Sequence, residues 1–170
     1  DQAHGWLSKQ LFSTLVDSDS TLSPVPQLAH SWEASLDGLE WTFYWRTDVY
    51  FHDDPCFPGG QGRRMTATDV AFSLERMLAT ETSSPGWWIL AHVGRIDVLD
   101  SATIRFRMTQ PEDAFLGRLA MPYCGVVAPE AVEMYGANFS SHPVGTGPFS
   151  LKAWARQEKI VPPRPPRYSR

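Results

Sequence analysis

Residues 52–54 combine side chains that could do chemistry. They read His-Asp-Asp, and an imidazole beside two carboxylates is what metal sites and general bases use. We favour a structural role, in which the short acidic side chains accept hydrogen bonds from the backbone amides of a turn. A metal or general-base site stays open as the alternative.

Two further patterns have the residue types of a reactive site but lack its full motif. Residues 59–64, Gly-Gly-Gln-Gly-Arg-Arg, are as glycine-rich as a phosphate loop but lack its lysine followed by serine or threonine, so we interpret them as a flexible surface loop. Ser13, His30 and Asp37 supply the residue types of a hydrolytic triad, but no serine lies in a G-x-S-x-G turn. The sequence therefore predicts neither an enzyme nor a cofactor site.

Composition indicates a globular chain that does not bind nucleic acid. The 170 residues are 42% hydrophobic, enough for one domain or a tight pair of subdomains. With 15 basic and 19 acidic residues the net charge is -4, without the basic excess that nucleic-acid binding requires. No run approaches the roughly 18 to 20 apolar residues that span a bilayer, and the first residues do not read as a signal sequence.

A β-hairpin and one helix are the clearest predicted elements. Residues 32–45 alternate apolar and polar on both sides of Asp37-Gly38, which predicts a hairpin with a two-residue turn. Thr66 is a natural N-cap with Asp69 three residues later, and an apolar stripe at helical spacing follows. Residues 83–86, Ser-Ser-Pro-Gly, break that helix.

The remaining periodicity predicts a mixed fold of the α/β or α+β class. Helices are expected over residues 7–16, 112–119 and 129–136, and strands at 49–51, 96–98, 103–108, 126–127, 148–154 and 159–161. Trp32, Trp41 and Trp45 fall on alternate hairpin positions, so we expect them in the core.

Five segments, read in order, resemble the family 5 extracellular solute-binding proteins, the oligopeptide, dipeptide and nickel receptors of ABC importers. They are residues 28–46 (with Leu-Ala-His-Ser-Trp-Glu, Asp-Gly and Trp-Thr-Phe), 49–53 (Val-Tyr-Phe-His-Asp), 66–73 (Thr-Ala-Thr-Asp-Val-Ala-Phe-Ser), 144–149 (Val-Gly-Thr-Gly-Pro-Phe) and 159–168. The chain departs from the family pattern at Asp54, where members have glycine, and in the proline-rich residues 162–166.

The resemblance implies an α/β fold of the type II periplasmic-binding-protein class, of which this chain is part of the first lobe. Residues 1–22 and 143–170 are expected in the main ligand-binding lobe and residues 23–142 in an inserted α/β subdomain, with the second lobe outside this chain. The implied function is delivery of peptides to the permease subunits of an ABC importer at a periplasmic or cell-surface location, with a lipid anchor possible outside this chain. A nickel chelate, haem or sugar as cargo, or a metabolite-sensing role in a regulator, are the alternatives.

The resemblance also suggests which residues face the ligand. We expect this role for Ser13, Trp87, Trp88, Met121, Pro122 and Tyr123. The alternative is that both tryptophans are buried core. Cys56 and Cys124 are disulfide candidates, because an exported protein meets an oxidising compartment, and two buried thiols are the other interpretation.

Overall fold

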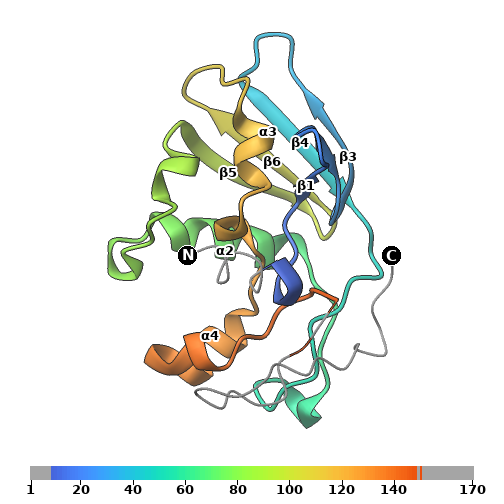
Figure 1. Cartoon of the computed structure of the whole chain (residues 1–170), viewed down its shortest axis with the longest axis vertical. Helices are drawn as coiled ribbons and strands as arrows, with labels where there is room; N and C mark the ends of the chain where they lie inside the picture. Colours follow the sequence, from blue (N-terminus) through green and yellow to red (C-terminus); the bar gives the residue numbers. More distant parts are fainter. Residues whose placement is uncertain (1–8, 149, 151–170) are drawn as a thin grey trace.

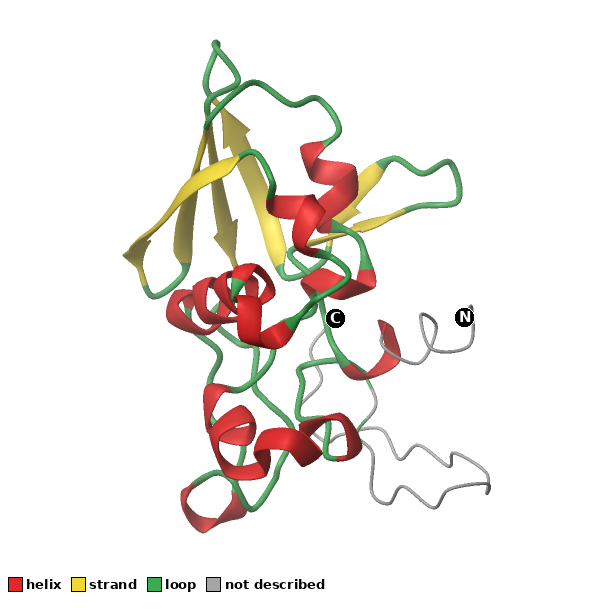
Figure 2. Cartoon of the chain, turned by 90° about the vertical axis from the view of Figure 1, so that its left-hand side faces the viewer, coloured by secondary structure: helices red, strands yellow, loops and turns green. Residues whose placement is uncertain are grey.

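The structure is a computed structural model that describes residues 9–148 and 150. A sheet forms one half of the chain, and helices joined by loops form the other (Figures 1 and 2). The strands are β1 (Val16–Ser18), β2 (Pro24–Pro26), β3 (Ala29–Ala34), β4 (Glu40–Trp45), β5 (Val93–Asp100) and β6 (Thr103–Met108). The helices are α2 (Ala67–Leu78), α3 (Phe115–Leu119) and α4 (Pro129–Tyr135), with 3-10 turns η1 (Pro58–Gly60), η2 (Thr80–Thr82), η3 (Trp87–Leu90), η4 (Pro122–Cys124) and η5 (Gly136–Ser141). Within residues 9–148, none of the helices has the length and apolar content needed to cross a membrane.

The main sheet has the strand order β3-β4-β6-β5, and all its neighbouring strands are antiparallel. The predicted hairpin is confirmed as β3 and β4, in which Trp32 pairs with Phe43. Its turn is longer than the two residues predicted, because the amide of Ser35 donates to the carbonyl of Glu40 at 2.9 Å and residues 36–39 lie outside the ladder. β1 and β2 form a separate antiparallel pair.

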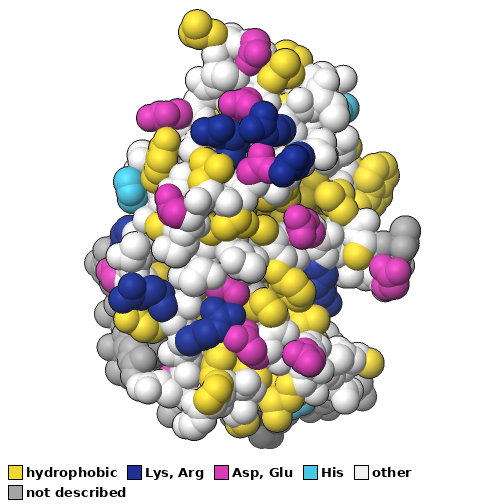
Figure 3. Space-filling model, turned by 180° about the vertical axis from the view of Figure 1, so that it is seen from behind, with side chains coloured by type: hydrophobic (Ala, Val, Ile, Leu, Met, Phe, Trp, Pro, Cys, Tyr) yellow, Lys and Arg dark blue, Asp and Glu magenta, His cyan; other side chains and the backbone are white. Residues whose placement is uncertain are grey.

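One face of the main sheet carries the core. The rings of Phe43 and Phe106 meet edge to face with centroids 5.4 Å apart, and Phe115 of α3 packs on Phe106 at 5.3 Å. Helix α2 contacts β5 and β6 beside them. On the opposite face Arg107 donates to Glu40 at 2.7 Å, and acidic and basic side chains are intermixed there (Figure 3). The sheet therefore has one dry face and one solvated face.

Helix α2 begins with the capping box that the sequence predicted. Thr66 and Asp69 cap each other, and the amide of Thr66 donates to the Asp69 carboxylate at 2.8 Å. Val70 and Leu74, which lie on the predicted apolar stripe, are both buried. A cap of this kind contributes on the order of 1 kcal/mol, and the burial of the stripe fixes the helix against the sheet.

The helix predicted over residues 7–16 is much shorter in the structure. Its described part is helical at residues 9–11 and then leaves the helix. The reason is tertiary: the amide of Thr14 donates to the side chain of Gln27 at 2.6 Å, and Val16 pairs with Pro26 in the β1–β2 ladder. The amide of Thr14 is therefore not available for the hydrogen bond to the carbonyl of Gln10 that a helix would need.

One predicted strand is wrong, and another is present only as a minimal antiparallel pairing. Residues 126–127 form a loop, because the amide of Val127 donates to the Ser73 hydroxyl at 2.9 Å and not to a neighbouring strand. Residues 49–51 pair antiparallel with residues 63–65: Tyr50 and Arg64 form a bridge, the amide of Phe51 donates to the carbonyl of Arg63 at 3.0 Å, and the amide of Met65 donates to that of Val49 at 2.9 Å. The strands predicted at 148–154 and 159–161 fall almost wholly outside the described residues.

The first and last described segments contact each other. The amide of Gly147 donates to the carbonyl of Leu11 at 3.0 Å. A Cβ on Gly145 would lie 2.3 Å from that carbonyl oxygen, so glycine is required here for close approach. This contact lies between two segments that were expected to belong to one lobe, and the division into residues 1–22 with 143–170 and residues 23–142 stays a prediction.

Candidate ligand-binding surface

Two segments that are distant in the sequence meet at Gly86 and Tyr123. A Cβ on Gly86 would lie 2.7 Å from the Cβ of Tyr123 and 2.8 Å from its Cγ, so Tyr123 packs directly on the Gly86 backbone. η3 begins at the next residue, Trp87, and η4 contains Tyr123 itself. The structure thus brings residues 87–88 and 121–123, which were both predicted to face the ligand, side by side.

The aromatic side chains of these segments are exposed. Trp87 is 59% exposed, Trp88 38% and Tyr123 50%, so neither tryptophan is a buried core residue. Pro122 and Met121 are partly buried, and Met121 packs against the core. We call Trp87, Trp88 and Tyr123 the aromatic surface. Their role in binding a ligand stays a prediction.

Arg118 of α3 connects the parts of the aromatic surface. Its guanidinium lies over the ring of Trp88, 5.3 Å from the centroid, and forms an ion pair with Glu112. Its backbone carbonyl accepts the amide of Met121 at 3.0 Å. The sequence analysis missed this residue, because its contacts join three separate segments and leave no local motif.

Ser13, the sixth predicted ligand-facing residue, is placed differently. Its side chain is only 5% exposed, and its carbonyl accepts the amide of Val126 at 3.0 Å. Ser13 is therefore buried and does not share the exposure of the aromatic surface. His30 lies 2.9 Å from the Ser31 hydroxyl and Asp37 accepts the Ser35 hydroxyl in the hairpin turn, so the triad residue types are engaged in separate local contacts.

Residues 52–54 have the structural role that we favoured. The Nε2 of His52 donates to the carbonyl of Gly147 at 2.8 Å, and the buried Nδ1 has no hydrogen-bond partner among the described residues. Burial lowers the pKa of His52, and the hydrogen bond to Gly147 offsets only part of this effect. Asp53 accepts the amide of Gly62 at 2.9 Å. In the described part of the chain, no group of three or more His, Cys, Asp or Glu side chains could hold a metal ion.

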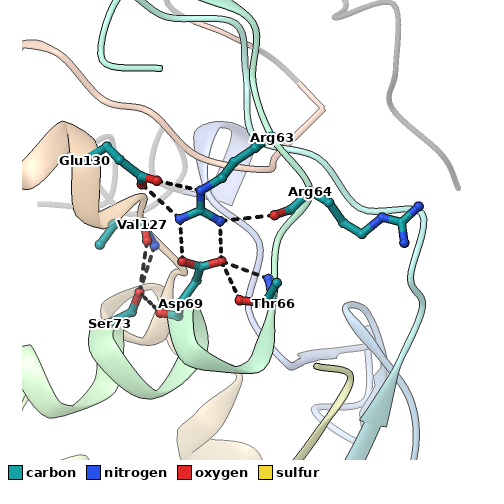
Figure 4. Close-up of polar contacts among 7 residues, drawn as sticks. All are labelled: Arg63, Arg64, Thr66, Asp69, Ser73, Val127 and Glu130. Carbon is teal, nitrogen blue, oxygen red and sulfur yellow. Dashed lines mark hydrogen bonds and ion pairs between the residues drawn. The ribbon is translucent and has the colours of Figure 1, made fainter. Parts of the chain in front are cut away.

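Arg63 is the centre of a polar network that the sequence analysis also missed (Figure 4). Its guanidinium donates to the two carboxylate oxygens of Asp69 at 2.8 and 2.7 Å, and to those of Glu130 at 2.5 and 2.9 Å. The stacked rings of Phe51 and Phe57 both lie beside it, with centroids 5.2 and 5.9 Å from its Cζ. The side chain of Asp69 is only 3% exposed. One arginine thus joins the loop before α2, α2 itself and α4.

Cys56 and Cys124 are free thiols in the structure, so the disulfide considered from the sequence is not formed there. The buried Cys124 thiol donates to the carbonyl of Arg118 at 3.7 Å, while the amide of Cys56 donates to Asp54 at 2.9 Å. Burial raises the pKa of both thiols to about 12. The thiolate form that forms disulfides is therefore disfavoured at both positions.

The sequence of most of the chain matches a known protein family. Residues 23–170 match the bacterial extracellular solute-binding proteins, family 5 middle. The chain belongs to this family. Family 5 members are extracellular or periplasmic solute-binding receptors, as the order of the five sequence segments implied.

Individual relatives agree in sequence and in fold. The glutathione-binding protein GsiB of Salmonella choleraesuis is 30% identical over 154 residues, which cover 91% of this family 5 chain and 28% of GsiB. DppA of Helicobacter pylori, solved with the peptide STSA, is 32% identical with a TM-score of 0.80, over 94% of this chain and 34% of DppA. AgaA from A. tumefaciens R10, solved with agropinic acid, is 27% identical with a TM-score of 0.88, over 100% of this chain and 33% of AgaA.

These likenesses confirm the predicted fold class, an α/β fold of the type II periplasmic binding proteins. The chain spans less than a third of the length of the curated relative GsiB.

Proposed function

We propose that this chain is part of a receptor that binds short peptides outside the cytoplasm and delivers them to an ABC importer, without catalysing a reaction. The aromatic surface is the observation that supports this most. Tryptophan is buried on average, yet Trp87 and Trp88 are adjacent and exposed. Aromatic rings give a large contact area at a low cost in side-chain entropy. Methionine, here Met121 in the segment of Tyr123, adapts to varied side chains.

The ligands named with the relatives favour the same chemical class. GsiB is named for glutathione and DppA was solved with the peptide STSA, and both of these ligands are peptides. Agropinic acid, bound by AgaA, is a small organic acid. All three ligands carry a free carboxylate. A small acid of the agropinic type is the second candidate, because AgaA resembles this chain over its whole length.

The proposed receptor has a second lobe outside this chain. Residues 1–22 and 143–170 are assigned to the main ligand-binding lobe and residues 23–142 to an inserted subdomain, and the aromatic surface faces the second lobe. Backbone hydrogen bonds hold the extended peptide, and hydrated side-chain pockets tolerate its sequence. Closure of the lobes then presents the receptor to the permease subunits.

Titration calorimetry on the full-length receptor tests the proposal. The probes are the peptide STSA, glutathione, agropinic acid and a nickel–histidine chelate. We expect binding of at least one of the two peptides, with a negative heat-capacity change from the burial of aromatic surface. Binding of the chelate or of agropinic acid alone would show that the peptide assignment is wrong.

A further inference from the structure

Strand β5 forms one edge of the main sheet, at the opposite side from β3 (Figure 1). Among the described residues, no strand pairs with the outer side of β5. β3, at the other edge, contacts β2. An unpaired edge is a template on which a further strand can pair. β5 is therefore the place where this sheet can be extended.

The register of the sheet shows which backbone groups of β5 point outward. The amide of Met108 donates to the carbonyl of Leu39, so the backbone of Met108 points toward β4. The direction of hydrogen bonding alternates along an antiparallel strand, so Arg107 points toward β5, where it pairs with Arg95. By the same alternation, the N–H and C=O of Ile96 point away from β6. Ile96 therefore presents its backbone at the open edge.

The side chains that flank Ile96 are complementary in charge to a second copy of themselves. Arg95 and Asp97 lie on the solvated face of the sheet, with the Nε of Arg95 2.5 Å from the Asp97 carboxylate. In an antiparallel pairing of two β5 strands about a two-fold axis at Ile96, Arg95 of each copy faces Asp97 of the other. Opposite charges in facing positions stabilise a strand pair, and side chains are closest in the positions beside a hydrogen-bonded pair.

Other symmetric registers lack this match. With the axis at Arg95 or at Asp97, identical charges face each other, which destabilises a strand pair. Irregularities in the β5–β6 pairing lie on both sides of residues 95–98, so these residues form the regular part of the edge. An axis at Val98 carries the pairing out of this part. The edge therefore favours the axis at Ile96.

The pairing also covers an apolar side chain at the edge. Val98 lies on the face of β5 that carries the core, opposite Ile104, and is 44% exposed. An inward-pointing charge is one way in which proteins keep an edge strand unpaired, and β5 has valine at this position. The contact of two short edges is small beside the roughly 1,200–2,000 Å² of a standard stable interface, so the association is weak and reversible.

We propose that β5 is an interaction surface for a second copy of the receptor, and that two receptors associate through antiparallel β5 strands about a two-fold axis at Ile96. Each copy uses the same edge, so the assembly closes at two copies and leaves no β5 edge for a third. The inference does not depend on which ligand the receptor binds.

Sedimentation equilibrium of the full-length receptor tests the proposal. We expect the natural receptor to dimerise reversibly, with a dissociation constant on the order of 100 µM. Arg95→Glu and Asp97→Lys each place two like-charge pairs across the axis, so each variant should dimerise at least about tenfold more weakly. In an equimolar mixture, the introduced glutamate faces the introduced lysine and Asp97 faces Arg95. The mixed dimer should therefore form about as well as the natural one.

A second pair of variants leaves these ion pairs intact. Val98→Lys puts a charge at the edge and should also weaken the dimer, by about tenfold. Leu36→Lys is the matched control, because Leu36 is a fully exposed apolar residue of the β3–β4 turn, and it should leave the dimer unchanged.

Three results would overturn the proposal. The first is a natural receptor that stays monomeric at concentrations up to about 1 mM. The second is a mixture of Arg95→Glu and Asp97→Lys that dimerises no better than either variant alone. The third is an equal effect of Val98→Lys and Leu36→Lys, which would place the interface away from β5.

Discussion

Tyr123 lies against the backbone of Gly86, so closely that a Cβ on Gly86 would be 2.7 Å from the Cβ of Tyr123. This contact joins the segment after α2 to the segment after α3. Gly86 itself has φ −92°, so its backbone conformation suits any residue and only the lack of a side chain matters. This contact helps to set the relative position of the exposed tryptophans and Tyr123.

The substitution Gly86→Ala should therefore separate the two segments. We expect ligand affinity of the full-length receptor to fall about tenfold, because a displacement near an angstrom is enough to misalign a binding site. Gly117→Ala is the matched control, since a Cβ there meets open space within helix α3 and should stabilise by about 0.4 to 1 kcal/mol. Equal ligand affinity in the two variants, measured by calorimetry, would contradict the role of the contact.

The exposed tryptophans should matter for binding more than for folding. We expect Trp87→Ala and Trp88→Ala to weaken peptide binding about tenfold or more, as loss of an aromatic anchor does. The free energy of unfolding should change by less than about 1 kcal/mol, because the side chains are 59% and 38% exposed. Trp45→Ala, at a 3% exposed position, should show the reverse, with a loss of about 3 to 5 kcal/mol. If Trp87→Ala and Trp88→Ala leave the peptide affinity unchanged and sharply lower the stability, the two side chains stabilise the fold and do not bind the ligand.

The Arg63 network should be the most sensitive polar site in this chain. Arg63→Ala leaves the carboxylate of Asp69, 3% exposed, without its bidentate partner. Loss of one partner of a buried pair typically costs about 3 kcal/mol or more, so we expect a loss of that size in urea unfolding. Arg95→Ala removes an ion pair of a 75% exposed arginine and should cost about 1 kcal/mol at most. Similar losses in both variants would refute the special position of Arg63.

Features that depend on residues close together in the sequence could be predicted from it, whereas features that depend on distant residues could not. The β3–β4 hairpin and the start of α2 follow from alternation and from the Thr66–Asp69 capping box, and both are confirmed. Arg63 was missed because its partner Glu130 lies 67 positions away. The strand at residues 126–127 was predicted wrongly because the side chain of Ser73 takes the backbone hydrogen bond of Val127.

The candidate ligand-binding surface could likewise be predicted only in part. Trp87 and Trp88 stood out in the sequence because they follow a Ser-Ser-Pro-Gly break, where packing does not require two indoles. Residues 121–123 came from the family resemblance. The contact between Tyr123 and Gly86, and the position of Arg118 over the Trp88 ring, arise only when the chain folds. Ser13 was predicted to face the ligand and is buried in the structure, and its role in binding stays a prediction.

The stability of the fold should decrease with acid through His52. Burial lowers its pKa below the value of about 6.5 in an unfolded chain, so the unfolded state binds the proton first as pH falls. The stabilisation is present above about pH 6.5 and is lost as pH falls through the folded-state pKa. His52→Gln keeps an N–H donor for Gly147 without titrating, so its urea midpoint should vary less than that of the natural receptor between about pH 7 and pH 5. Parallel midpoint curves would contradict this assignment.

The identity of the naturally bound ligand tests the peptide-receptor account most directly. The full-length receptor is purified without added ligand and denatured, and the released molecules are identified by mass spectrometry. The account predicts a series of short peptides that vary in sequence. A single metal chelate, or one non-peptide acid, in place of that series would contradict it.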